Sequence, residues 1–134
     1  MSEDILKRAM EYRDRARTYF KNFEKERMKG NREKAGEALW GVVSCLINAL
    51  ALIVCGRPLP DHKEQRRFAR EFILSTFEDG EELVKAYNNA EKFHANFYHA
   101  FLNGEEFEKI GADIVRLTER LDTTLVERLR KLQF

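Results

Sequence analysis

The sequence predicts an all-α fold, an up-and-down antiparallel four-helix bundle with one additional, shorter helix. Apolar residues recur at alternating three- and four-residue spacings, the period of one face of a helix. Short polar residues are followed three positions later by Glu at several points, a pattern that starts helices. Four glycines divide the chain into segments of similar length, and both prolines follow the second of them: Gly30, Gly56, Gly80 and Gly104.

The first helix is expected at about 2–29. Ser2 begins it, and the acidic residues Glu3 and Asp4 complement the positive end of the helix dipole. Its apolar residues follow the spacing of the inner seam of a bundle: Ile5, Ala9, Tyr12, Ala16, Tyr19 and Phe23.

The second helix is expected at about 31–55, with Asn31 as its N-cap. No residue from Ala38 to Gly56 is charged, and a stretch of that length is a transmembrane candidate. The other segments each carry an apolar stripe that needs a partner, however. We therefore predict the central buried helix of a soluble bundle, without membrane association.

The remaining helices are expected at about 61–78, 80–102 and 104–132. Asp61, Asp79 and Asn103 each precede a Glu by three residues and are expected to cap them. Short connections favour antiparallel neighbours. A length of 134 residues and a mass of 15.8 kDa fit a single domain, 1–134.

Composition limits the function. The chain has 24 Lys and Arg against 23 Asp and Glu, which argues against a general polyanion binder but allows a local basic patch. The N-terminus lacks the apolar core of a signal peptide. Cys45 and Cys55 lie on one predicted helix about 15 Å apart, too far for a disulfide. We expect a cytoplasmic protein.

Two histidines of the fourth predicted helix are candidates for chemistry. His94 lies within the apolar stripe and is expected to point inward, either as a core residue or as a functional one. His99 lies on a polar strip with Asn88 and Lys92, either as a surface residue or as a general acid/base or phosphate donor. Glu91-x-x-His94 matches half of a di-iron motif, but no second Glu-x-x-His exists. We therefore expect no metal and no cofactor.

A second candidate surface is basic. Arginines gather in the proline loop and at the start of the third predicted helix, and their forked side chains suit phosphate. The alternative is an ordinary solvated helix face. The residues concerned are Arg57, Arg66, Arg67 and Arg70, together with Lys63.

Two blocks resemble the PaREP1-type proteins of archaea, which belong to the HEPN superfamily of nucleotide-binding helical proteins. The first block runs from Glu33 to Trp40 and Gly41, before the apolar helix, and the second is Phe93-His94-Ala95-Asn96-Phe97-Tyr98. The resemblance covers about residues 3–130. It implies an up-and-down four-helix bundle with a short extra helix.

Many HEPN proteins are metal-independent RNases with an Arg and a His four to six residues apart, at a dimer interface. The resemblance therefore implies a catalytic role for His99, with Asn96 inside the motif and His94 at the arginine position. Arg57 and His62 have the same spacing, but they precede the third predicted helix, and we interpret this match as coincidence.

Three functional hypotheses follow. The first is a module, without robust catalysis, that binds a nucleotide, RNA or a partner such as a nucleotidyltransferase. The second is a toxin-like RNase using His99 at a homodimer interface, and the third is a structural homodimer without a nucleic-acid role. The expected nucleotide contacts are Asn88, Lys92, Tyr98, Arg57, Arg66, Arg67 and Arg70.

Overall fold

The computed structural model describes residues 3–94 and 104–133, and these form five α-helices. The helices are α1 (Glu3–Met28), α2 (Arg32–Cys55), α3 (His62–Thr76), α4 (Gly80–His94) and α5 (Gly104–Gln133). The all-α class and the order of the five helices are therefore confirmed. The expected continuation of the fourth helix beyond His94 lies outside the described residues.

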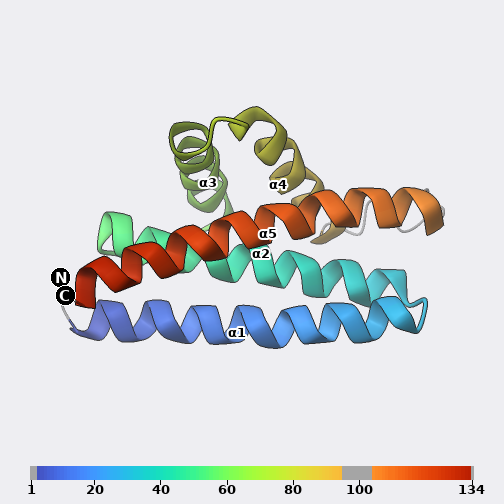
Figure 1. The fold of residues 1–134 in the computed structure, drawn as a ribbon, viewed down its shortest axis with the longest axis horizontal. Coiled ribbons are helices and arrows are strands. Elements are labelled where there is room, and N and C mark those ends of the chain that lie inside the picture. The colour runs from blue at the N-terminus through green and yellow to red at the C-terminus, as the bar shows by residue number, and fades with distance from the viewer. Residues whose placement is uncertain (1–2, 95–103, 134) are drawn as a thin grey trace.

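The three long helices α1, α2 and α5 lie side by side along the molecule, and α3 and α4 form a hairpin that stands across them (Figure 1). α2 is central and packs against each of the other four helices. The predicted up-and-down arrangement of four helices is not confirmed, because the α3–α4 hairpin does not run alongside the long helices. At 15 residues, α3 is about 22 Å long, too short to line a bundle of helices of 24 to 30 residues.

α2 has the two ends that the sequence predicts. The side chain of Asn31 accepts a hydrogen bond from the backbone N–H of Lys34, and Gly56 closes the helix in the left-handed conformation with φ of 72°. The helix is long and apolar enough to cross a membrane, but 72% of the residues in its most apolar window are buried within the fold. Packing by its own chain therefore accounts for its apolar character.

The apolar seam of α5 closes the core from the other side. Ile110 is partly buried, and the other residues of this seam are buried: Phe107, Ile114, Leu117, Leu121, Leu125 and Leu129. Four of them have no exposed surface: Ile114, Leu117, Leu121 and Leu125. The seam of α1 is less complete, because Tyr19 is 41% exposed while Ala9, Ala16 and Phe23 are buried. Ion pairs Arg13–Asp122 (2.7 Å) and Arg27–Glu108 (2.9 Å) join α1 to α5.

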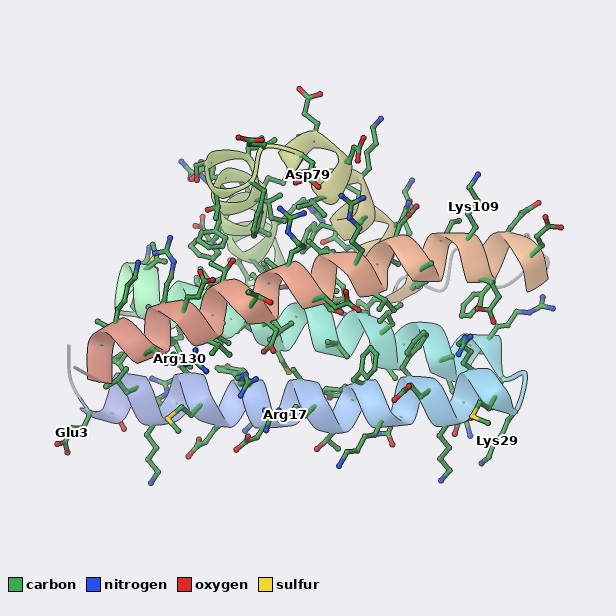
Figure 2. All side chains as sticks on the ribbon, in the orientation of Figure 1. Glu3, Arg17, Lys29, Asp79, Lys109 and Arg130 are labelled. Atoms are coloured by element: carbon green, nitrogen blue, oxygen red, sulfur yellow. The ribbon has the colours of Figure 1, made fainter. Side chains whose placement is uncertain are left out.

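The turn between α3 and α4 is fastened to α5 through Asp79, which lies at the tip of the hairpin (Figure 2). Its Oδ2 accepts hydrogen bonds from Arg116 (2.7 Å) and Arg120 (3.0 Å). The guanidinium of Arg120 also lies over the ring of Phe77, 4.8 Å from its centroid. The carboxylate predicted to cap α4 thus accepts from two arginines of α5, and it anchors the hairpin.

This anchor predicts a pH-dependent stability. The hydrogen bond from Arg120, with the charges of Arg120 and Arg116, holds the pKa of Asp79 below its ordinary value of 3.8. The Asp79 carboxyl therefore binds a proton more tightly in the unfolded chain than in the folded protein. The stabilisation is present above about pH 4 and is lost as the pH falls through the lower pKa of the folded state.

Asp79→Asn should be less stable than wild type at pH 5 and should lose less stability on acidification to about pH 2.5, as measured by urea unfolding. Glu78→Gln is the control, and equal losses in wild type and Asp79→Asn would contradict the prediction.

Replacing each of two glycines with alanine should have opposite effects on the stability of the protein. A Cβ on Gly80 would lie 3.0 Å from the carbonyl oxygen of Ile73 and from the Cα of Leu74, and these backbone atoms have little freedom to move. A Cβ on Gly111, inside α5, would meet nothing within 4 Å. Thermal unfolding should show Gly111→Ala stabilised by about 0.5–1 kcal/mol and Gly80→Ala destabilised. Stabilisation of both variants would contradict the close approach of α3 to α4.

Candidate functional site

A cavity of about 570 Å³ opens where α1, α2 and the end of α4 meet. We call it the α1–α2–α4 cavity. Its volume is within the range of small-molecule sites. Its lining mixes aromatic, amide and charged side chains: Tyr19, Asn22 and Glu26 from α1, Lys34, Glu37, Trp40 and Gly41 among those from α2, and His94 from α4.

His94 is the predicted site residue that lines this cavity. Its Nδ1 lies 2.8 Å from Oε1 of Glu37, and its ring stacks on Trp40 at a centroid distance of 5.6 Å and an angle of 25°. The side chain is 43% exposed, so the expectation that it points into the core is wrong. A carboxylate that accepts from Nδ1–H leaves Nε2 to exchange a proton with a ligand.

His62 is a second imidazole beside the first. It opens α3, where Asp61 accepts from the backbone N–H of Glu64 (2.9 Å), and its ring centroid lies 5.7 Å from that of His94. The sequence interpretation gave His62 no functional role. The structure brings it to the site because α3 and α4 pack as an antiparallel pair.

Trp40 forms the inner wall of the site. It is 4% exposed and meets Tyr87 edge to face, with ring centroids 5.8 Å apart. Tyr87 is fully buried, and within the described part of the chain its hydroxyl has no hydrogen-bond partner. Burial, with the nearby charge of Glu91, raises the pKa of Tyr87 above its ordinary value of 10.0. Tyr87 is therefore neutral at physiological pH, and its ring packs behind Trp40.

The Cys45 thiol also lines the cavity, but its chemistry is suppressed. Burial raises its pKa to about 11, although the charge of Arg15 acts in the opposite direction. The thiol of Cys45 is therefore protonated at neutral pH. Because the nucleophilic form of cysteine is the thiolate, Cys45 is a poor nucleophile there. Cys45 and Cys55 are both free, and Cys55 is exposed.

Two arginines of the predicted basic surface are paired with carboxylates. Nε of Arg66 lies 2.9 Å from the Glu91 carboxylate on α4, and Nε of Arg67 lies 3.6 Å from Glu71 on its own helix. Arg57 and Arg70 are exposed, as is Lys92, while Asn88 is half-buried. None of these six residues lines the α1–α2–α4 cavity.

Three candidates, Asn96, Tyr98 and His99, lie outside the described residues. Over 3–94 and 104–133, no group of three His, Cys, Asp or Glu side chains is arranged to hold a metal ion. Residues that the sequence interpretation missed include Glu37 and Trp40, although both belong to the block that carries the family resemblance. The resemblance of that block to the family was the sequence signal that could have identified these two residues.

Residues 11–118 match the model of the archaeal PaREP1/PaREP8 family. No curated protein and no solved structure matches the chain.

Proposed function

The chain belongs to the archaeal PaREP1/PaREP8 family, and from this premise we propose that it is a HEPN-like helical module that binds a nucleotide or RNA in the α1–α2–α4 cavity. The observation that carries the proposal is the meeting of His94 with Glu37 and Trp40 at a cavity of suitable size. An aromatic wall suits a base, and an oriented imidazole suits a sugar hydroxyl or phosphate.

The charges indicate which part of the ligand enters. Glu26 and Glu37 line the cavity with Lys34, so a phosphate placed deep inside would face two carboxylates. We propose that the base enters the cavity and that the phosphate stays near Lys34, which is exposed. Because Arg66 and Arg67 are already paired, affinity for RNA should fall only modestly with salt, as expected for few phosphate contacts.

Isothermal titration calorimetry with 5′-mononucleotides and a short single-stranded RNA tests this proposal. His94→Ala and Lys34→Gln should each weaken binding by about tenfold, a typical loss for one good polar contact. Lys29→Gln removes an exposed charge from the turn after α1, outside the cavity, and is the matched control. Absence of binding heat at millimolar ligand, or equal losses in all three variants, would overturn the proposal.

A second candidate function is metal-independent cleavage of RNA, and the His94–His62 pair favours it. One imidazole would take the proton of the ribose 2′-hydroxyl as its oxygen attacks phosphorus. The other would protonate the departing 5′-oxygen, leaving a 2′,3′-cyclic phosphate. Cleavage in EDTA that is lost in His62→Gln and in His94→Gln, and never seen with a 2′-deoxy substrate, would establish it. The role proposed for His99 by resemblance is tested by His99→Ala in the same assay.

The assembly expected from the resemblance is also a proposal. We propose a cytoplasmic homodimer, with a nucleotidyltransferase as an alternative partner. Light scattering coupled to size-exclusion chromatography measures the mass directly against the 15.8 kDa of one chain. A mass of one chain at micromolar concentration would contradict the homodimer.

A further inference from the structure

One face of α1 presents three side chains of different chemistry to the α1–α2–α4 cavity. Tyr19, Asn22 and Glu26 follow one another at spacings of three and four residues, so they lie one above another on the helix. Glu26 is half-buried. Within 3–94 and 104–133, the side chains of Asn22 and Glu26 make no hydrogen bond or ion pair. An amide and a carboxylate one helical turn apart are thus available to a ligand.

We propose that the α1–α2–α4 cavity selects guanine and that Asn22 and Glu26 recognise its Watson–Crick edge. This inference rests on the proposed binding of a nucleotide. Guanine carries two adjacent donors, N1–H and N2–H₂, which match the two oxygens of one carboxylate, and beside them the acceptor O6 matches an amide N–H₂. Adenine, cytosine and uracil lack two adjacent donors on this edge, so Glu26 cannot accept two parallel hydrogen bonds from them.

Tyr19 supplies the surface on which the base stacks. A Cβ at Gly41 would lie 2.8 to 2.9 Å from three atoms of the Tyr19 ring, so the ring rests against the bare backbone of α2. Tyr19 as a whole is nevertheless 41% exposed, so it remains accessible to a ligand. Stacking on aromatic rings is a general means of holding an unpaired base. Gly41 thus sets the position of Tyr19 beside Asn22.

Glu37 does not compete for this role. Its Oε1 is engaged by Nδ1 of His94 at 2.8 Å, whereas Glu26 lines the cavity from a different helix, α1. The two carboxylates therefore have separate functions: Glu37 orients an imidazole, and Glu26 is left to accept hydrogen bonds from the base.

Calorimetric titration of GMP, IMP and AMP against three proteins tests the inference. IMP differs from GMP only by the absence of the N2 amine. Wild type should bind GMP at least about tenfold more tightly than IMP or AMP, the discrimination typical of one bidentate contact. Glu26→Gln should bring the three dissociation constants to within about twofold of one another. Glu24→Gln, on the same helix but lining a different groove, should retain the preference.

The outcomes separate the two proposals. Nucleotide binding by wild type without preference for GMP overturns guanine selection and leaves the proposed function standing. If Glu26→Gln still prefers GMP, the assignment of guanine recognition to Glu26 is overturned. No binding of any nucleotide overturns the proposed function and, with it, the inference. Tyr19→Ala, at an exposed position, should weaken the binding of all three nucleotides by the same factor, since every base can stack on an aromatic ring.

Discussion

Replacing Trp40 with alanine is expected to destabilise the protein by about 3–5 kcal/mol, the usual cost of removing a large buried aromatic side chain. Trp40 is 4% exposed and touches two other rings, Tyr87 edge to face and His94 by stacking. The substitution therefore leaves a void between α2 and α4 that the surrounding helices can only partly fill. Urea unfolding followed by circular dichroism measures the loss.

The control for this prediction is Trp40→Phe, which keeps a ring against Tyr87 and should lose less than half as much stability. A loss below about 1 kcal/mol in Trp40→Ala would show that the α2–α4 contact contributes little. Trp40→Phe should also retain nucleotide binding if stacking beneath His94 is what the site requires.

Replacing Leu121 with alanine is expected to cost about 2–5 kcal/mol by the same mechanism. Leu121 has no exposed surface and lies in the middle of the α5 seam, between the equally buried Leu117 and Leu125. A cavity at this point weakens the closure of the core by α5.

Leu132→Ala is the matched control on the same helix. Leu132 is 40% exposed, so its truncation removes little buried surface. Urea unfolding should shift strongly in Leu121→Ala and by no more than about 0.5 kcal/mol in Leu132→Ala. Equal shifts in the two variants would contradict the burial of the α5 seam.

The helices could be predicted from sequence because their signals are local. Asn31, Gly56 and Asp61 act within one turn of the chain, and each is found in the expected role. The packing of the helices is a different matter. An apolar stripe identifies the face of a helix that is buried, but it does not identify its partner or crossing angle. The α3–α4 hairpin therefore stands across the long helices although its stripes are typical of a bundle.

The position of His94 shows how the periodicity argument fails at the end of a helix. The stripe of α4 runs through Leu83, Tyr87 and Ala90, which are all buried. One turn further on, the buried residue is Phe93, which stacks on Phe107, and the neighbouring His94 meets the Glu37 carboxylate instead. Continuing the stripe with a strict three- and four-residue spacing therefore chose the wrong one of two adjacent residues.

The site as a whole could be predicted only in part. Arg66 was expected to bind phosphate, but antiparallel packing of α3 on α4 places Glu91 beside it. Contact between Tyr19 and Gly41 depends on how α1 folds back on α2, which local sequence does not encode. A glycine inside a helix is a local sign of a close neighbour, and for Gly41 that neighbour is Tyr19.

Trp40 is the only tryptophan in the chain, and it lines the cavity proposed to bind ligand. The tryptophan fluorescence of the protein therefore originates at one point, against the ring of His94. A ligand that enters, or a proton that binds to the imidazole, changes the surroundings of this single fluorophore. Emission from the unlabelled protein would then report occupancy in real time, so stopped-flow mixing could give association and dissociation rates without any dye.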